Sequence, residues 1–128
     1  MNITECFASH KYINLTTFRK TGQEVPTPVW FVEMDGKLYV FTGAQTGKAK
    51  RIRANGRARV APSDGRGKPL GEFLPMRGGF ATDPAVIRRA DDLYKRKYGF
   101  QRALINWLNA LRGRKDTPVL IELTPESA

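Results

Sequence analysis

The segment VPTPVWFVEMDGKLYVFTGAQTGKAKRIRANGRAR, residues 25–59, decides the fold of this chain. Two apolar runs meet at Asp35-Gly36, and an Asp-Gly pair between such runs is a strong β-hairpin signal because a type I′ turn needs φ > 0 at both central residues. The second run leads into a loop of small residues and then into a stretch of Lys and Arg. We therefore predict two strands and a short basic helix, with the bounds 25–33, 37–42 and 48–55.

Outside this segment the pattern favours further short strands joined by polar turns. Residues 12–18 alternate in polarity and are rich in β-branched side chains, which is typical of a strand. The other expected strands are residues 57–63, a segment within 69–81 that Gly78-Gly79 would bend or bulge, and the apolar run 118–123.

Helices are expected mainly in the second half of the chain. Asp83 and Pro84 supply an N-cap and a first helical residue for a helix that ends near residue 98. A second helix is expected at 101–111, where leucines recur on one face. Strands with short turns and helices inserted late predict a single α+β domain over residues 1–128, built on an antiparallel barrel.

Two prolines constrain the strand expected at residues 25–33. Pro26 and Pro28 are spaced by two, so they share one face, and neither can donate a hydrogen bond to a neighbouring strand. Such a strand lies at the edge of a sheet, or its N–H side meets something other than a strand. A ligand is one candidate.

Composition limits the classes of protein to consider. The chain has 128 residues, of which 41% are hydrophobic, which suits one globular domain. No apolar run approaches the ~20 residues of a membrane span, and the N-terminus lacks the pattern of a secretory signal, so we expect a cytoplasmic protein without membrane association. Cys6 and His10 are the only residues of their types, which argues against a metal site.

The charge points to anionic partners. Lys and Arg number 22 against 12 Asp and Glu, giving a net charge of +10. This balance favours nucleic acid, anionic lipid or a phosphorylated small molecule, and charge alone does not choose among them.

A phosphate site is predicted where the loop meets the basic helix. Thr42 and Thr46 offer hydroxyl groups, and the first helical turn contributes the positive end of its dipole. Lys48, Lys50 and Arg51 add cations within reach of one phosphate. The alternative reading is a solvated helix face, which is the usual role of a charge run.

The proline-containing strand is the candidate platform for a flat polar ring. Thr27, Val29 and Trp30 lie along it, and the prolines free one side of its backbone to meet a ligand. The alternative, which strand periodicity alone favours, is that Val29 packs in the core and Trp30 is a partly buried aromatic residue. No triad, dinucleotide-binding glycine motif or other catalytic constellation is present, so we assign no catalytic residue, and any chemistry would be that of a bound cofactor.

Two stretches, KYINLTTFRKTGQEVPTPVWFV and DGKLYVFTGAQTGKAKRIRANGRARVAPSDGRGKPLGE, resemble the flavin-binding split-barrel family related to pyridoxamine 5′-phosphate oxidase. More narrowly, the chain resembles the branch of deazaflavin (coenzyme F420)-dependent oxidoreductases. The likeness is close over residues 11–72 and looser to the last strand.

The resemblance implies a six-stranded antiparallel split β-barrel that forms a homodimer, with F420 or FMN at the subunit interface. It places Thr27, Pro28, Val29 and Trp30 along the cofactor ring. It places Thr42, Thr46 and Lys48 at the phosphate, with Lys50 and Arg51 nearby. The implied activity is an oxidoreductase that transfers a hydride between the cofactor and an unidentified small molecule.

The sequence also departs from the oxidase itself. Two cations that the oxidase carries at the ends of its second strand would fall near Pro26 and Phe31 here, which argues against oxidation of pyridoxamine phosphate. Two alternatives stay open: a non-catalytic protein that binds flavin or F420, and a basic barrel that binds nucleic acid. Against the second, the aromatic residues do not interleave with Lys and Arg along one strand.

Overall fold

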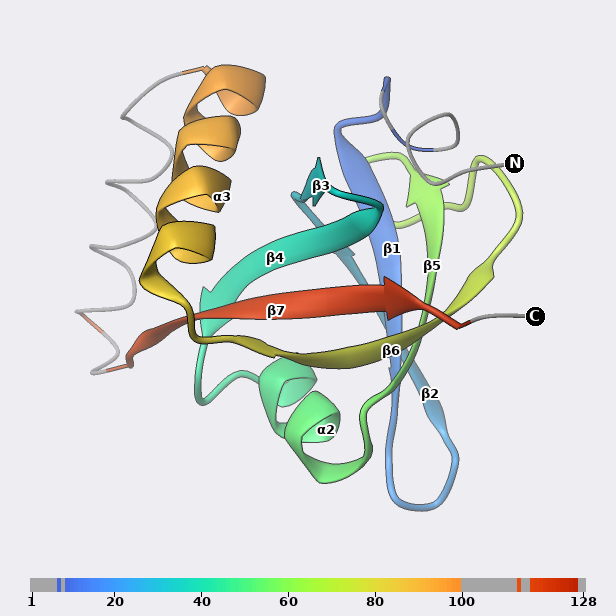
Figure 1. Cartoon of the computed structure of the whole chain (residues 1–128). Coiled ribbons are helices and arrows are strands. Elements are labelled where there is room, and N and C mark those ends of the chain that lie inside the picture. The colour runs from blue at the N-terminus through green and yellow to red at the C-terminus, as the bar shows by residue number, and fades with distance from the viewer. Residues whose placement is uncertain (1–6, 8, 100–112, 114–115, 127–128) are drawn as a thin grey trace.

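The computed structural model describes residues 7, 9–99, 113 and 116–126, and its strands curve into a barrel with one helix at an end and another along a side (Figure 1). The helix predicted at 101–111 lies outside the described residues. The elements are β1 (Tyr12–Phe18), β2 (Glu24–Val29), β3 (Val32–Met34), β4 (Lys37–Gly43), α2 (Gly47–Asn55), β5 (Arg57–Ser63), β6 (Leu74–Ala81), α3 (Pro84–Tyr98) and β7 (Pro118–Pro125).

All strand pairs are antiparallel, and the order in the sheet is β2-β1-β5-β6-β7-β4-β3. The strands at the two ends of this order, β2 and β3, are consecutive in the chain and are separated by Trp30 and Phe31 alone. The chain itself therefore joins the two end strands and closes the barrel. We call this junction, Trp30 and Phe31, the seam. The prediction of one strand over 25–33 was wrong, and its division at the seam raises the strand count from six to seven.

The predicted hairpin is confirmed. Asp35 and Gly36 have φ values of 53° and 80°, which are the positive values that an Asp-Gly turn requires. They join β3 to β4, whose pairing places Met34 opposite Lys37. The predicted edge position of the proline-containing strand is confirmed as well, because β2 ends the sheet order.

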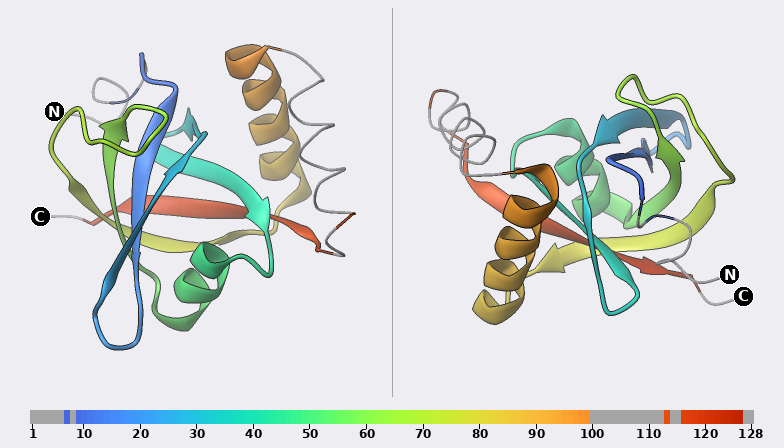
Figure 2. Two further views of the ribbon diagram at one scale, coloured as in Figure 1. Left: turned by 180° about the vertical axis from the view of Figure 1, so that it is seen from behind. Right: turned by 90° about the horizontal axis from the view of Figure 1, so that it is seen from above.

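Two cores follow from the alternation of side chains across the strands. On β4, Leu38 and Val40 point into the barrel with Phe7, Ile13 and other fully buried residues. Tyr39 of the same strand points to the opposite face, where it packs with Ala90 and Tyr94 of α3. Figure 2 shows α3 standing beside the barrel from behind and from above.

Helix α2 has the predicted start and stop. The Oγ1 atom of Thr46 accepts a hydrogen bond from the N–H of Ala49, and Gly56 ends the helix in the left-handed conformation with φ of 69°. The helix packs across β6, where a Cβ atom on Gly78 would lie 2.5 Å from Cδ1 of Ile52. Of the bulge or bend predicted at Gly78-Gly79, the bulge was wrong, because the register of β6 with β7 continues unbroken. Gly78 is needed for the close approach of α2.

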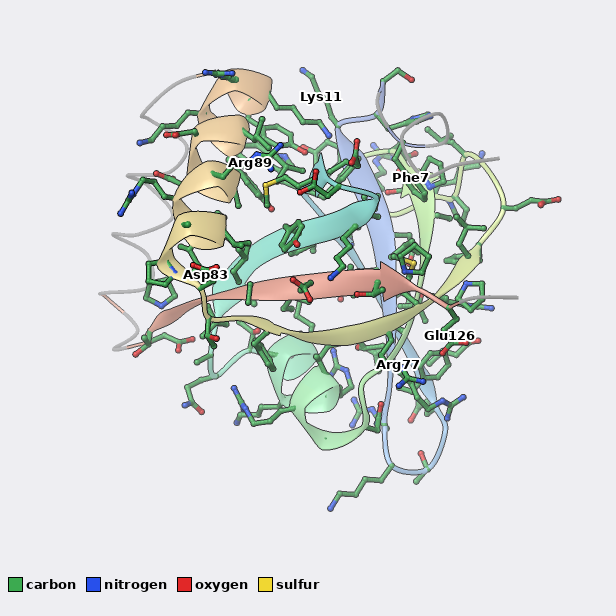
Figure 3. The ribbon with its side chains drawn as sticks, in the orientation of Figure 1. Phe7, Lys11, Arg77, Asp83, Arg89 and Glu126 are labelled. Carbon is green, nitrogen blue, oxygen red and sulfur yellow. The ribbon has the colours of Figure 1, made fainter. Side chains whose placement is uncertain are left out.

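Helix α3 begins as its sequence predicts. Asp83, seen at the foot of the helix in Figure 3, accepts a hydrogen bond from the N–H of Ala85, and Pro84 is the first helical residue. Three basic residues in the last turn complement the helix dipole. Within the described residues, no helix has both the length and the apolar character needed to cross a membrane.

Candidate functional site

The loop between β4 and α2 uses its hydroxyl groups internally. Oγ1 of Thr46 donates to the carbonyl oxygen of Gly43 at 2.8 Å and caps α2 by accepting from Ala49. Oγ1 of Thr42 lies 3.1 Å from Oγ1 of Thr46, and Thr42 is buried. Both threonines predicted to bind phosphate thus shape the loop, and the hydroxyl proton of Thr46 is already engaged.

Arg51 is the best-positioned cation at the start of α2. Its Nε donates to Oγ1 of Thr17 on β1 at 2.6 Å. Neither of its two Nη groups has a partner among the described residues, and the guanidinium folds back over Gly47, where a Cβ atom would lie 2.7 Å from Nη1. The fork of the guanidinium is therefore held in place and free to bind an anion in bidentate fashion.

Lys48 is half-buried beside this guanidinium. Burial, together with the positive charge of Arg51, lowers the pKa of the Lys48 amine. The pKa of Arg51 is lowered in turn by burial and by the charge of Arg19. Three cations, Arg19 from the turn after β1 and Lys48 and Arg51 from α2, therefore repel one another around one spot. A bound anion relieves such repulsion.

No carboxylate compensates this cluster within the described part of the chain. The first turn of α2 contains no acidic residue, although it is the positive end of the helix dipole. Asp116 is used by the loop instead, where its carboxylate accepts from the N–H of Gln45 at 3.1 Å. The ion pairs between described residues lie elsewhere: Lys37–Glu122, Arg59–Glu24, Arg89–Asp35 and Lys95–Asp91.

The other cations of the basic stretch divide into two groups. Lys50, a predicted site residue, is exposed, and its amine has no hydrogen bond or ion pair with another described residue. Arg53, Arg57 and Arg59 instead cover aromatic rings, with guanidinium carbons 5.4, 4.5 and 4.3 Å from the centroids of Phe80, Phe18 and Phe73 respectively. These three arginines pack along the barrel and do not join the cluster around Arg51.

The four residues predicted to line a ring do not share one surface. Thr27 and Val29 pair with Leu15 and Ile13 of β1, so their side chains point to the inner face of the barrel. Pro28 lies on the outer face, where its ring is within 3.4 Å of a Cβ atom built on Gly67. The side chains of β2 therefore form no common surface for a ligand, and the part of β2 that a ligand could contact is its outer backbone edge.

Trp30 belongs to the seam. Its ring stacks on that of Tyr98 with centroids 4.3 Å apart and planes at 5°. The Tyr94 hydroxyl donates to the Trp30 carbonyl oxygen at 2.7 Å, and the N–H of Phe31 donates to the Tyr98 hydroxyl at 2.9 Å. Burial raises the pKa of both tyrosines, which therefore stay protonated.

Lys97 is the third residue of α3 that binds the seam. Its Nζ donates to the Phe31 carbonyl oxygen at 3.1 Å and lies 3.4 Å from the centroid of the Phe31 ring. Burial lowers the pKa of this amine to about 8. Neither the role of α3 nor that of Thr17 was predicted, because these residues meet the site only through tertiary contacts.

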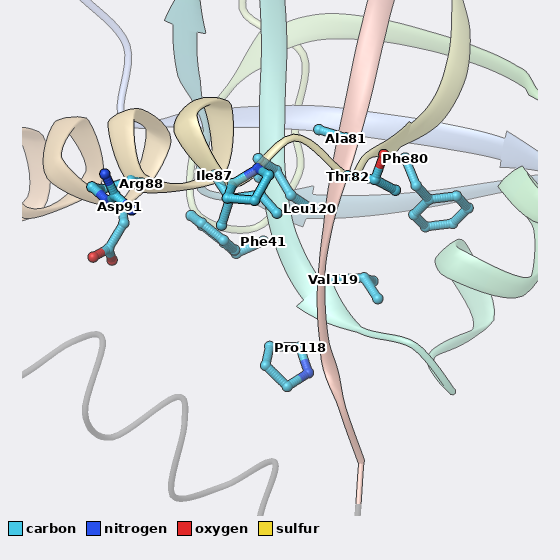
Figure 4. Close-up of a pocket in the computed structure, with 11 residues that line it drawn as sticks. Phe41, Phe80, Ala81, Thr82, Ile87, Arg88, Asp91, Pro118, Val119 and Leu120 are labelled. Atoms are coloured by element: carbon cyan, nitrogen blue, oxygen red, sulfur yellow. The ribbon is translucent and has the colours of Figure 1, made fainter.

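A separate cavity of about 720 Å³ lies between α3 and the strands β4, β6 and β7 (Figure 4). Its walls are mainly apolar, with Arg88 and Asp91 at one side. None of the predicted site residues lines it. Among the described residues no cluster of His, Cys, Asp and Glu could hold a metal ion.

No family model and no curated protein matches the sequence. The fold, in contrast, matches solved structures over nearly the whole chain. A candidate pyridoxamine 5′-phosphate oxidase from Listeria innocua is 19% identical, with 98% of this chain and 91% of that chain covered at a TM-score of 0.68.

Two further structures show the range of proteins with this fold. An FAD-binding protein from Mesorhizobium loti is 18% identical, with 97% and 85% of the two chains covered at a TM-score of 0.67. The heme storage protein HutZ from Vibrio cholerae is 15% identical, with 100% of this chain and 93% of that chain covered at a TM-score of 0.73. The chain therefore has the split-barrel fold of pyridoxamine 5′-phosphate oxidase-like proteins, a fold that serves more than one function.

Proposed function

We propose that this protein binds a phosphorylated flavin-type cofactor, FMN or F420, with the phosphate at Arg51 and Lys48. One observation carries the proposal: Thr17 holds the Arg51 guanidinium beside the half-buried Lys48. No described residue binds either Nη group, and no described carboxylate pairs with Arg51 or Lys48. An anion there would gain charge-assisted hydrogen bonds and remove the repulsion between the cations.

The direction of β2 supports the placement of the ring. Thr17 pairs with Val25, so Arg51 lies near the start of β2, and the strand runs from there toward Trp30. A ligand with its phosphate at Arg51 would extend along the exposed edge of this strand. The geometry fits the order phosphate, chain and ring that the resemblance implies.

The proposed activity is that of an oxidoreductase acting on a small molecule. When bound, the cofactor supplies the ring position that accepts or donates a hydride. The protein would fix the phosphate with Arg51 and Lys48 and orient the ring against β2. We further propose that the protein is a homodimer with the cofactor at the interface, which sedimentation of the cofactor-bound protein tests directly.

The experiment is a titration of cofactor-free protein with FMN and with F420, followed by tryptophan and cofactor fluorescence. Saturable binding of either cofactor supports the proposal, and binding of neither rejects it. Turnover of a reduced cofactor by candidate acceptors then separates an oxidoreductase from a non-catalytic binding protein on the same fold.

The alternative of a nucleic-acid-binding barrel is less well supported. Base stacking on single-stranded nucleic acid needs exposed aromatic faces. Phe18 is covered by Arg57, and one face of the exposed Trp30 ring is taken up by its stack on Tyr98. Tyr39 is buried. Binding to an oligonucleotide that weakens steeply with salt would reverse this preference.

A further inference from the structure

The edge of β2 presents hydrogen-bond acceptors without donors, and the register of the β1–β2 hairpin establishes this. The N–H of Arg19 donates to the carbonyl oxygen of Gln23 at 2.9 Å, which marks a hydrogen-bonded pair at the turn. Hydrogen-bonded pairs alternate along an antiparallel ladder. Counted from that pair, the backbone N–H and C=O groups of Val25, Thr27 and Val29 face β1.

Pro26 and Pro28 occupy the intervening positions. Their partners across the ladder are Thr16 and Asn14, in pairs that exchange no hydrogen bond. Since the N–H and C=O groups of one strand residue point to the same side, both proline carbonyl oxygens face away from β1. Proline has no N–H, so these two positions add acceptors to the edge and no donor.

The other edge of β1 gives independent support for this register. Pro62 of β5 pairs with Ile13, and its carbonyl oxygen accepts from the N–H of Leu70 at 2.7 Å. That carbonyl is therefore turned away from β1. This is the orientation expected if Ile13 exchanges its hydrogen bonds with Val29 of β2.

The acceptor edge is open and lies next to the cation cluster. Pro26 and Pro28 are exposed, and β2 has no strand on its outer side. A further strand would need donors as well as acceptors, so the edge is poorly suited to strand addition. Val25 pairs with Thr17, the residue that holds Arg51, and Pro28 follows three residues later, roughly 10 Å along the strand.

We propose that the Pro26–Pro28 edge selects a ring that donates an N–H group to one of these carbonyl oxygens. The inference rests on the proposed function, and it specifies which part of the cofactor faces the protein. The flavin and deazaflavin rings both carry an imide N–H at position 3, between two ring carbonyl groups. This N–H group is the donor that we expect a proline carbonyl oxygen of β2 to accept from.

The test compares FMN with its N3-methyl derivative, which keeps the phosphate and loses the donor. We expect the derivative to bind about tenfold more weakly or worse, because a carbonyl oxygen is covered without a partner. Affinities within about twofold of each other would overturn the inference and leave the proposed function intact. If neither FMN nor F420 binds, the proposed function and the inference both fail.

A variant separates the lost donor from simple crowding by the methyl group. In Pro26→Ala/Pro28→Ala the edge gains two N–H donors that can serve the ring carbonyl groups, so the preference for FMN over the derivative is expected to shrink at least threefold. Pro75→Ala on β6 is the matched control and keeps the wild-type preference. An unchanged preference in the double variant would mean that the methyl group acts by its bulk, and the inference would be wrong.

Discussion

Arg51 on α2 and Thr17 on β1 are joined by a hydrogen bond of 2.6 Å from Nε to Oγ1, across 34 residues of sequence. The bond uses Nε and leaves the two Nη groups for an end-on bidentate contact with an anion. It therefore fixes the direction of the two Nη groups. Thr17 is a positioning residue in this account, and Arg51 is the residue that would touch the phosphate.

Replacing Thr17 by valine tests this relationship. Thr17→Val keeps the shape of a fully buried side chain and removes the acceptor, so we expect FMN to bind about tenfold more weakly while the fold is retained. Thr17→Ser restores the acceptor and should restore the affinity. Equal affinities in all three proteins would show that Arg51 needs no such support.

Lys48 and Lys50 form a matched pair for the phosphate contact. Lys48→Met should weaken FMN binding by about 1.5–3 kcal/mol, the scale of a hydrogen bond to a charged group. Lys50→Met removes the same charge from an exposed position and should have a much smaller effect. Calorimetric titration measures both, and equal losses would show that net charge alone, and not the site, attracts the ligand.

Gly78 and Gly79 provide a test of how α2 is placed. Gly78→Ala would drive a methyl group against Ile52 and is expected to cost about 1–3 kcal/mol of unfolding free energy. Gly79→Ala faces open space and should cost about 0.5 kcal/mol or less. Adding Ile52→Val removes the clashing Cδ1 and should recover part of the loss in urea denaturation. If Ile52→Val restores no stability, the contact between the added methyl group and Ile52 is not the source of the loss.

The sequence predicts the strands more fully than it predicts their closure. Asp35-Gly36 fixes a hairpin because only a few residues tolerate the required φ values. The division of residues 25–33 could not be predicted, because Trp30 and Phe31 continue an apolar run. Their backbone groups bind Tyr94 and Tyr98, more than 60 residues later, and a local pattern carries no sign of such partners.

The candidate site, like the fold, could be predicted from the sequence only in part. The pattern of small residues and cations predicts an anion site at the start of α2, which stays a prediction. Lys48 and Arg51 lie close enough there for the charge of Arg51 to lower the pKa of Lys48. It does not predict Thr17 or Arg19, since a strand residue and a turn residue carry no sign of which helix they approach. Nor does it predict that Thr42 and Thr46 bind each other.

The seam can be tested at Tyr98. Tyr98→Phe leaves the N–H of Phe31 without its acceptor, so we expect a loss of about 1–3 kcal/mol in unfolding free energy. Tyr12→Phe is the control, because the Tyr12 hydroxyl makes no hydrogen bond to a described residue. If both variants unfold at the same urea concentration, the hydroxyl of Tyr98 does not hold the seam.

The low pKa of Lys97 predicts a pH dependence of stability. Its value of about 8 lies below the ordinary 10.5, so the unfolded chain binds more protons between these two pH values. The free energy of unfolding should therefore rise with pH across this window relative to Lys97→Met. Parallel curves for the two proteins, measured in urea from about pH 7 to about pH 10, would contradict the burial of a charged amine at the seam.

The most direct test of the phosphate site compares FMN with riboflavin, which has the same ring and no phosphate, in the wild type and in Arg51→Met. We predict that the wild type prefers FMN by at least about tenfold, and that the preference nearly disappears in the variant while riboflavin affinity is unchanged. Equal affinity of the wild type for FMN and riboflavin, or a full preference retained in Arg51→Met, would contradict the account.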